Sequence, residues 1–417
     1  MIPGSGPRKP PKPEVRGGLH QTFRALRHRN FRLFVFGQII SLIGTWMQNV
    51  AQSWLVYRLS HSELLVGTAW FCSQIPVLAL GSIGGLVSDR FPRHRIVILT
   101  QALSMLQAFA LGLLTLAGHV QVWHVLALAT VLGTINAFDM PARQALIVQL
   151  ANKEDLLNAI SLNSAIFNAA RIVGPAIAGL LVAALGEGVC FTINGVSFVA
   201  VIIALMAMRI PADTTRFAAS SWSYLIEGFR YAWHYLPVRS TLMLLGATTL
   251  GGMPAVVLMP FFSDDIFHRG AQGLGFLMGA MGVGAVVGTL VLAHSNEVTG
   301  LRRVIVFSAL STGVTFILFS LSPRFYLSIA IMPVIGFGVM RQNAAANTLI
   351  QTLIPDQFRG RVMSLYAMTV VGLGPFGSLA AGAIAHALGP RLTVLMGGAV
   401  TVAAAWVFHA KARAVRA

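Results

Sequence analysis

Apolar segments of helical length alternate with short polar breaks along nearly the whole chain. A helix needs about 20 mostly apolar residues to cross the hydrocarbon core of a bilayer, and twelve segments meet that requirement. The pattern therefore predicts an all-α integral membrane protein with twelve transmembrane helices. The predicted spans are residues 33–57, 64–87, 96–117, 122–142, 159–185, 189–209, 240–263, 272–293, 304–321, 325–347, 362–387 and 391–410.

Two polar stretches divide the chain into regions. Residues 1–22 are rich in proline, glycine and basic residues, a composition that predicts a disordered cytoplasmic tail. Residues 211–239 form the longest break, and the aromatic-rich sequence SWSYLIEGFRYAWHYL within it is amphipathic. A helix of this kind lies along a membrane surface. We predict that this cytoplasmic linker joins two pseudo-symmetric six-helix bundles, residues 23–210 and 240–417.

Composition and charge agree with a membrane protein. Hydrophobic residues make up 56% of the chain and charged residues 10%, whereas soluble domains carry about a quarter charged residues. With the N-terminus inside, 24 of the 30 lysines and arginines fall on the inner side of the spans and 4 in outer loops. Positive residues accumulate on the cytoplasmic side of membrane proteins, so both termini are predicted to be cytoplasmic.

The net charge of +17 changes the expected partners in one respect. In a soluble protein, such an excess would suggest binding to nucleic acid. Here the positive residues lie mostly between apolar segments, where they orient the helices and contact lipid headgroups. We therefore expect membrane lipids, and no nucleic acid, among the partners.

The sequence lacks the motifs of several enzyme classes. It contains no GxxxxGK[ST] motif for nucleoside triphosphates and no HExxH motif for zinc. Cys72 and Cys190 both lie within apolar segments, which predicts buried thiols and neither a disulfide framework nor a metal site. No cofactor, metal or catalytic residue is expected, and the protein is not predicted to be an enzyme.

Polar side chains recur on one face of the first span. Gln38, Ser41, Thr45, Gln48 and Gln52 follow one another in steps of three or four residues, which places them on the same side of a helix. In lipid, such a face must point into the bundle or into a water-filled cavity. Polar contacts between helices and the lining of a substrate cavity both explain the pattern, and our hypothesis is the cavity.

Two arginines lie inside predicted spans, Arg171 in the fifth and Arg341 in the tenth. A charge at this depth is costly unless it is paired or hydrated. Arg171 and Asn168 are therefore predicted to face the substrate cavity opposite the polar stripe. Arg341 and Asn343 are the predicted counterparts in the second half of the chain.

Charged residues also gather where the second, third and fourth spans reach the inner side. Asp89 stands among arginines in the sequence GGLVSDRFPRHR, and Asp139 and Arg143 are four residues apart on one helical face, where they can pair. Gly85 is expected to let two helices approach closely. Asp89 belongs either to a solvated loop or to a salt bridge that forms and breaks as the protein changes conformation. The predicted inner gate consists of Gly85, Asp89, Arg90, Arg93, Asp139 and Arg143.

Glycine–proline pairs recur once in each half of the chain. Gly174 and Pro175 lie in the fifth span, and Gly374 and Pro375 lie in the eleventh. Such pairs weaken the helix backbone locally. They are predicted to permit bending of these two helices.

Aromatic and thioether side chains within the spans are expected to serve packing. Trp46 and Trp70 are interpreted as packing residues or interface anchors. Met278 and Met281 are expected in the core, although methionine also suits a pocket that accepts several ligands.

The loop between the second and third spans carries a resemblance to a known family. GGLVSDRFPRHR resembles the signature of the major facilitator superfamily, with Gly85, Asp89, Arg90 and Arg93 at matching positions and Pro92 where many members have glycine. AFDMPARQALIVQL, NAISLNSAIFNAARIVGPAIAGLL and CFTINGVSF are similar to the subgroup of the enterobactin exporter and of macrolide and drug efflux proteins. The likeness covers nearly the whole chain after residue 22.

The resemblance implies a location and a mechanism. Such proteins of the bacterial inner membrane work by alternating access around a central site, usually driven by the proton gradient. The resemblance further implies that Asp89 and Arg93 interact with Asp139 and close the inner side while the outer side is open. The first span has no acidic residue, unlike the simplest drug–proton antiporters. Asp264 and Asp265 end the seventh span on the outer side, where we expect a solvated boundary in preference to a proton-loading site.

These observations together predict a monomeric secondary active transporter. Its expected activity is proton-coupled efflux of a small organic molecule, such as a siderophore or a drug-like compound. An importer or a lipid flippase would share the fold, and a non-transporting membrane receptor is a further alternative from a different class.

Overall fold

The computed structural model describes residues 24–152, 154–208, 222–294 and 300–414. Within these ranges the regular secondary structure is helical and includes no strand. Twelve helical segments are long and apolar enough to cross a membrane. The predicted all-α membrane class and the predicted number of spans are therefore confirmed.

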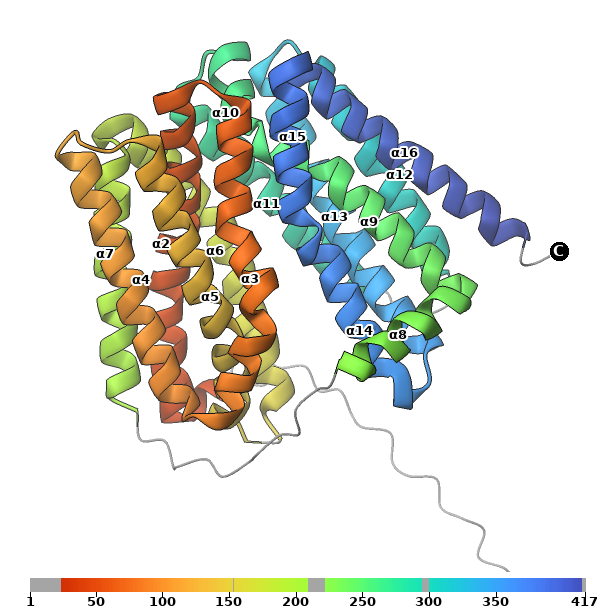
Figure 1. Ribbon diagram of the computed structural model, residues 1–417, viewed down its shortest axis with the longest axis horizontal. Coiled ribbons are helices and arrows are strands. Elements are labelled where there is room, and N and C mark those ends of the chain that lie inside the picture. Colours follow the sequence, from red (N-terminus) through yellow and green to blue (C-terminus); the bar gives the residue numbers. More distant parts are fainter. Residues whose placement is uncertain (1–23, 153, 209–221, 295–299, 415–417) are drawn as a thin grey trace, which may run out of the picture.

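The first half of the chain supplies the first six spans, α2 to α7, after a short 3₁₀ helix, η1 (Figure 1). The turns between them are short, so consecutive spans run in opposite directions. The bounds are η1 Arg24–Arg27, α2 Arg29–Ser60, α3 Glu63–Arg90, α4 Arg93–Leu116, α5 Val122–Leu150, α6 Leu156–Leu185 and α7 Glu187–Met206.

The second half begins with α8 and supplies the other six spans. One π-helical turn, η2, follows the seventh span, and another, η3, lies within the eleventh; at each turn the backbone ladder is locally widened. The bounds are α8 Trp222–His234, α9 Leu236–Val257, α10 Met259–Phe261, η2 Phe262–Ile266, α11 Gly270–His294, α12 Leu301–Leu321, α13 Phe325–Leu353, α14 Asp356–Ala367, η3 Met368–Gly372, α15 Gly374–Leu388 and α16 Pro390–Ala414.

Two helices continue well beyond their predicted ends. The fourth span was predicted to end at residue 142, but α5 continues to Leu150, and α13 passes its predicted end at residue 347 and reaches Leu353. The added segments, RQALIVQL and TLIQTL, mix polar residues with apolar ones and include good helix formers such as leucine and glutamine. Hydropathy alone therefore ended these helices too early, and Asp139 and Arg143 lie inside α5.

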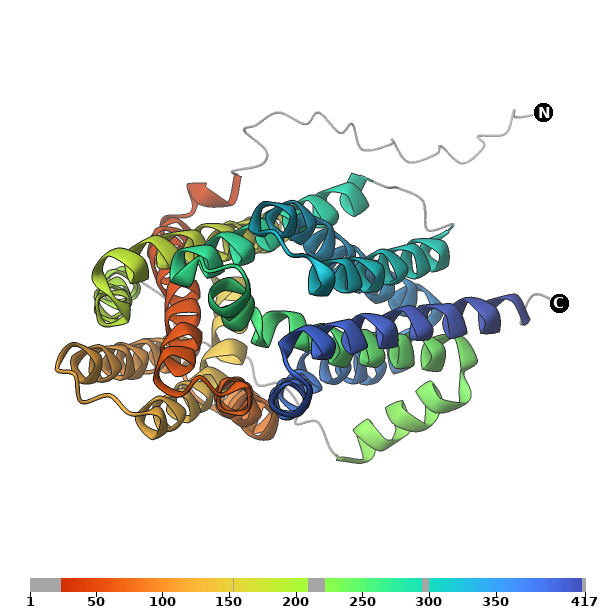
Figure 2. The same ribbon diagram turned by 90° about the horizontal axis from the view of Figure 1, so that it is seen from above.

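The two halves form separate bundles that meet at one end. We call the end that carries η1 and α8 the linker end, and the opposite end the far end. The bundles lie against each other toward the far end and diverge toward the linker end (Figure 1). Figure 2 shows them from above as two groups of helices. Across the boundary, α3 packs along α15 and α6 packs along α11.

Glycines allow these cross-bundle helices to approach closely. A Cβ atom added to Gly67 of α3 would stand 2.5 Å from the Ser378 carbonyl oxygen of α15. A Cβ added to Gly179 of α6 would stand 2.9 Å from the Gly275 Cα of α11. Both contacts lie in the far-end halves of their helices. Because small residues let membrane helices pack backbone to backbone, the bundles are tightly joined there.

A buried acid fixes the start of the first span at the linker end. Asp155, directly before α6, forms ion pairs with Arg24 Nε at 2.8 Å and Arg27 at 2.7 Å, and its Oδ2 lies 2.8 Å from His28 Nε2. The hydrogen bond with His28 and the charges of Arg24 and Arg27 lower the pKa of the Asp155 carboxyl. This cluster ties η1 and the start of α2 to α6.

The amphipathic segment of the predicted linker is present as α8. It packs against α14 of the second bundle, where the Tyr231 and Phe358 rings stack with centroids 4.5 Å apart and Glu227 pairs with Arg361. The linker helix is thus attached to the second bundle. Its predicted cytoplasmic position and the predicted domain boundaries remain predictions, and residues 1–22 lie outside the described residues.

Large apolar side chains cover the outer faces of the spans. Leu113, Leu157 and Phe307 are each 70% or more exposed. In water such a surface would be unfavourable, because exposing apolar area costs about 25 cal/mol per Å². A lipid environment removes this cost, which is the physical reason why the spans lack polar faces.

Candidate functional site

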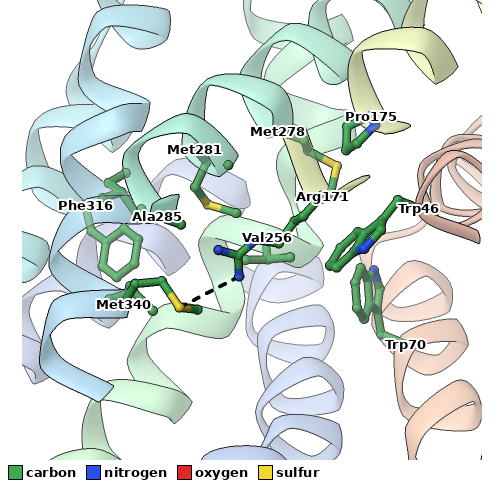
Figure 3. A pocket seen from close by; sticks show the side chains of 14 residues that line it. Trp46, Trp70, Arg171, Pro175, Val256, Met278, Met281, Ala285, Phe316 and Met340 are labelled. Atoms are coloured by element: carbon green, nitrogen blue, oxygen red, sulfur yellow. Dashed lines mark hydrogen bonds between the residues drawn. The ribbon is translucent and has the colours of Figure 1, made fainter. Parts of the chain in front are cut away.

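A cavity of about 200 Å³ lies between the two bundles near mid-depth. We call it the central cavity (Figure 3). Helices of both halves contribute to its wall, so a rotation of one bundle against the other changes its shape. The lining residues are Trp46, Trp70, Arg171, Pro175, Val256, Met278, Met281, Gly282, Ala285, Phe316, Ile335, Gly336, Val339 and Met340.

Arg171 supplies the one charged side chain of this lining. It projects from the middle of α6 toward α11 and α13 (Figure 3). One terminal nitrogen donates to Asn168 Oδ1 at 3.1 Å, and the other lies 3.9 Å from the Met340 sulfur. Its Nε is buried and finds no partner among the described residues. Since a thioether is a weak acceptor, the guanidinium retains donor capacity for a ligand.

Aromatic rings and thioethers form most of the remaining wall. Trp46 and Trp70 lie on the side of the first bundle, and Met278 and Met281 on the side of α11 (Figure 3). All four line the central cavity, and the expected packing role also holds, because Met278 belongs to the buried core and Trp70 and Met281 pack against it. Their hydropathy is the same in a core and in a pocket, so only the relative position of the bundles separates the two roles.

Gly174 sets the position of Trp46. A Cβ added to Gly174 would stand 2.5 Å from the Trp46 Cβ and 2.9 Å from the Ile43 carbonyl oxygen. Any larger residue would push α6 away from α2 and shift the indole. α6 itself runs unbroken through Gly174 and Pro175, so the glycine here serves close packing.

The second glycine–proline pair has a different setting. The π-helical turn η3 ends at Gly372, and α15 begins at Gly374 with Pro375 in its first turn. A Cβ at Gly374 would meet no atom within 4 Å. The eleventh span thus has a break in its regular ladder at this pair, and bending remains a prediction for both pairs.

The polar stripe of the first span points mainly into its own bundle. Gln48 is 1% exposed, accepts a hydrogen bond from Asn194 at 2.7 Å and donates one to Gln107 at 3.0 Å. Thr45 donates to the Ser41 carbonyl at 2.9 Å. Gln48 thus joins α2, α4 and α7, which is the alternative of polar contacts between helices. The lining of the central cavity includes none of the five residues of the stripe, Gln38, Ser41, Thr45, Gln48 and Gln52.

Arg341 and Asn343 also lie outside the lining of the central cavity. The Arg341 guanidinium lies over the Phe337 ring, 5.5 Å from its centroid. The Asn343 carbonyl accepts a hydrogen bond from Tyr366 at 3.0 Å. Of the four residues, the structure thus brings Arg171 to the cavity, while Asn168 lies outside the lining and reaches it only through its hydrogen bond with Arg171.

Asp139 is the centre of a buried polar cluster in the first bundle. It is 1% exposed and pairs with Arg143, as the four-residue spacing predicts. Its Oδ1 accepts hydrogen bonds from Thr100 at 2.6 Å and Gln101 at 3.1 Å. Arg143 also lies 3.4 Å from Gln38 Oε1. The cluster therefore connects α2, α4 and α5.

The end of α3 lies beside this cluster. Helices α3 and α5 approach each other closely at Gly84, and not at Gly85 as expected. A Cβ added to Gly84 would collide with the Ala137 carbonyl of α5, whereas a Cβ added to Gly85 would meet no atom within 4 Å. Asp89 is half-buried and Arg90 is exposed at the linker end, where the bundles diverge. The role of the inner-gate residues, with Arg93 buried at the start of α4, stays a prediction.

A hydrogen-bonded latch joins the bundles at the far end. The buried Tyr57 hydroxyl of α2 lies 2.9 Å from Asp264 Oδ2 and 2.6 Å from Asp265 Oδ1, both on η2. The Tyr57 ring also packs edge-on against Phe261 with centroids 4.8 Å apart. Asp265 is exposed and Asp264 is half-buried, as expected for a solvated boundary, and both acids also bond to Tyr57. We call Tyr57, Asp264 and Asp265 the far-end latch.

A second polar contact crosses the same end. His386 Nδ1 of α15 lies 3.7 Å from Glu63 Oε2 of α3. The far end is thus closed by hydrogen bonds, an ionisable pair and glycine packing. Among the described residues, no group of three or more histidine, cysteine, aspartate or glutamate side chains is placed to hold a metal.

Comparison with known proteins decides the family. A family model described as transmembrane secretion effector matches residues 20–416. The chain belongs to this family. It falls within the major facilitator superfamily, as the resemblance of its second-to-third-span loop implies, and it is a secondary transporter and not an enzyme.

Curated relatives cover nearly the full length. The chain is 27% identical to the multidrug efflux pump Tap of Mycolicibacterium fortuitum, over 87% of this chain and 91% of that protein. It is 25% identical to the staphyloferrin A transporter of Staphylococcus aureus, over 91% and 95%. The enterobactin exporter EntS of Shigella boydii is 24% identical, over 83% of each chain. The expected subgroup is thereby confirmed.

A solved structure shows the same fold. The nucleoside transporter NupG superposes with a TM-score of 0.73 at 13% sequence identity, covering 91% of this chain and 98% of the other. The twelve spans and the bacterial relatives make this transporter a multi-pass protein of the bacterial inner membrane.

Proposed function

We propose that this transporter exports a small organic molecule from the cytoplasm by alternating access around the central cavity. The observation that carries the proposal is the position of the cavity between two bundles that are joined at one end only. Membrane transporters of this architecture bind substrate near the midplane and rock the two halves around it. The relatives named as an efflux pump and an exporter support the outward direction.

The linker end is assigned to the cytoplasm in this proposal. Of the 30 lysines and arginines, 24 fall on the side of the tail and the linker, as expected for cytoplasmic segments. Both termini are then cytoplasmic, and the structure corresponds to a state open toward the inside. A substrate would enter from the cytoplasm and reach Arg171 before the far end opens.

Protons are the proposed coupling ion, and a monomer embedded in lipid is the proposed working unit. A driving ion must bind one state more tightly than the other. The far-end latch supports this role, because one Tyr57 hydroxyl hydrogen lies between two carboxylates. Loading a proton on one acid lets both acids share hydrogen bonds with Tyr57, which favours the state closed at the far end.

Flux in proteoliposomes tests the proposal. Vesicles with inside-out and right-side-out protein are loaded with 2-naphthalenesulfonate or ethidium, and flux is followed with and without a proton gradient against protein-free vesicles. Gradient-dependent movement toward the face opposite α8 is expected. Movement only toward the α8 face would make the protein an importer, and flux that ignores the gradient would exclude proton coupling.

The inner gate is proposed to close the linker end in the other half of the cycle. Asp89 would then meet groups near Asp139 as the bundles come together at that end. Asp89→Asn is expected to lose most transport while it still inserts and binds substrate. Glu154→Gln is the matched control, since Glu154 is an exposed acid at the same end. Normal transport by the Asp89 variant would exclude this gate.

A further inference from the structure

The lining of the central cavity restricts the charge of its ligand. Among the fourteen residues of the wall, Arg171 is cationic and none is acidic. A cationic ligand would lie beside this arginine with no carboxylate to offset the repulsion. A negatively charged group instead forms charge-assisted hydrogen bonds with a guanidinium, which are shorter and stronger than neutral ones.

The geometry of Arg171 favours a ligand as its missing partner. The buried Nε has no acceptor among the described residues, and NH1 has only the Met340 sulfur at 3.9 Å. Asn168 holds the remaining nitrogen at 3.1 Å and so fixes the direction of the guanidinium. Arg171 is half-buried with no carboxylate beside it in the lining, and a charge in an apolar surrounding is unfavourable unless it is paired, so an anion that reaches these two nitrogens is favoured.

The rest of the wall limits the ligand to one such charge. Apart from Arg171 and the two indole N–H groups, the lining side chains are apolar or absent. A second anionic group on the ligand would lose its water without gaining a charged partner, and burial of an unpaired charge is expensive. The cavity therefore suits a single anionic group on an otherwise apolar molecule.

The wall also suits a flat apolar body. Trp46, Trp70 and Phe316 present ring surfaces, and Met278, Met281 and Met340 present thioethers around the same space (Figure 3). Sulfur–aromatic contacts are favourable, and the unbranched methionine side chain adapts to different shapes. A cavity with this wall is expected to discriminate between ligands by their charge and to accept apolar bodies of different shapes.

We propose that the central cavity selects amphiphilic organic molecules with one negative charge on a flat apolar body, and that Arg171 recognises the charge. The inference rests on the proposed function, since it names the substrate class of the same cavity. It separates this chain from pumps that take cations, and it separates a monoanion from a polyanion.

Binding of four matched probes to the full chain in lipid nanodiscs tests the proposal. The probes share one ring system: 2-naphthalenesulfonate, the neutral 2-naphthalenesulfonamide, naphthalene-2,6-disulfonate and trimethyl(2-naphthyl)ammonium. Calorimetry is expected to show the monosulfonate binding about ten- to a hundredfold more tightly than the other three, the range of a charge-assisted hydrogen bond. Equal or tighter binding of any of the other three, or no binding of the monosulfonate, would overturn the proposal.

Variants of Arg171 assign the preference to one residue. Arg171→Gln is expected to bind the monosulfonate and the sulfonamide equally, and Arg171→Lys to keep part of the preference. Unchanged sulfonamide affinity in Arg171→Gln shows that the cavity is intact. Arg391→Gln, at an exposed position outside the cavity, removes the same charge and should behave as the native chain. A monosulfonate preference that survives Arg171→Gln would contradict the assignment.

Two further experiments distinguish a flat ligand from a lipid-like one, and the proposed ligand class from the proposed transport function. Tighter binding of 1-octanesulfonate than of 2-naphthalenesulfonate would point to a flexible, lipid-like chain and overturn the flat body. In proteoliposomes, transport of ethidium without any preference for the monosulfonate would leave the transporter standing and overturn the substrate class. Selective binding of the monosulfonate without transport of any probe would instead overturn the proposed function and leave the ligand class standing.

Discussion

Single residues in this transporter carry charges that the surrounding apolar structure must compensate. The Asp139 carboxylate shows complete compensation, because it pairs with Arg143 and accepts two further hydrogen bonds in the core of the first bundle. Arg171 shows partial compensation, with its Nε left open at the central cavity. The first arrangement stabilises a bundle, and the second prepares a binding site.

Asp139→Asn tests the stabilising role. The substitution leaves the Arg143 charge without its partner in a buried site, which typically costs about 3–5 kcal/mol. We expect a clearly lower thermal unfolding midpoint in detergent and a lower yield in the membrane. Asp356→Asn is the control, since Asp356 pairs with Arg359 at 2.5 Å while 86% exposed and surface pairs contribute at most about 1 kcal/mol. Equal midpoints for the two variants would contradict the assignment.

Tyr57→Phe tests the far-end latch. Removing the hydroxyl deletes its hydrogen bonds to two carboxylates while the ring keeps its contact with Phe261. Hydrogen bonds to charged groups contribute about 1.5–3 kcal/mol, so the far-end-open state should gain about tenfold or more in population. Spin labels at the exposed far-end positions His119 and Arg324, in a chain without native cysteines, should report longer distances.

The control for this latch is Tyr326→Phe. Tyr326 lies at the same end and is 73% exposed, so its hydroxyl is expected to have no influence on the distance between the bundles. A distance distribution that is unchanged in Tyr57→Phe, or changed equally in both variants, would exclude Tyr57 as a latch.

At the scale of whole elements, close approach of helices decides which glycine matters. In the Gly84-Gly85 pair, an alanine at 84 would collide with the Ala137 carbonyl, while one at 85 meets open space. Gly84→Ala should therefore separate α3 from α5 and lower the thermal unfolding midpoint, with Gly85→Ala unchanged in the same assay. The reverse order would show that the packing of α3 on α5 is described incorrectly.

The sequence predicts the helices well because lipid imposes a strong pattern. Every span had to be long and apolar, so their number and approximate positions followed from hydropathy. The four-residue spacing of Asp139 and Arg143 likewise predicted a local contact correctly. The periodicity of the polar stripe on α2 could not show whether this face lines a cavity or contacts other helices. In the structure, Gln48 bonds to Gln107 and Asn194 of neighbouring helices.

Contacts between the bundles are not encoded in any local pattern. Trp46 and Met278 are far apart in the sequence and belong to different bundles, so their joint role in the cavity depends on how the halves dock. The same holds for Tyr57 and Asp264, which are 207 residues apart. The sequence identified Asp264 and Asp265 as acidic residues at the end of a span, but no spacing in the sequence predicted their contact with Tyr57.

At the scale of the whole molecule, the structure has one closed end and one open end. Glycine packing, the far-end latch and the Glu63–His386 contact all lie at the far end. The central claim is that these contacts must break in every transport cycle, because a substrate in the central cavity leaves only when the far end opens. A protein with a permanently joined far end should bind its substrate and not move it.

A reversible cross-link between α3 and α15 tests that claim most directly. Cysteines replace Glu63 and His386, whose side chains meet at 3.7 Å, in a chain without Cys72 and Cys190, and a short bifunctional thiol reagent joins them. Proteoliposome flux of the probe that moves fastest should fall to the level of protein-free vesicles and recover on reduction, while probe binding persists and single-cysteine controls stay active. Undiminished flux through the fully cross-linked protein would contradict alternating access around the central cavity.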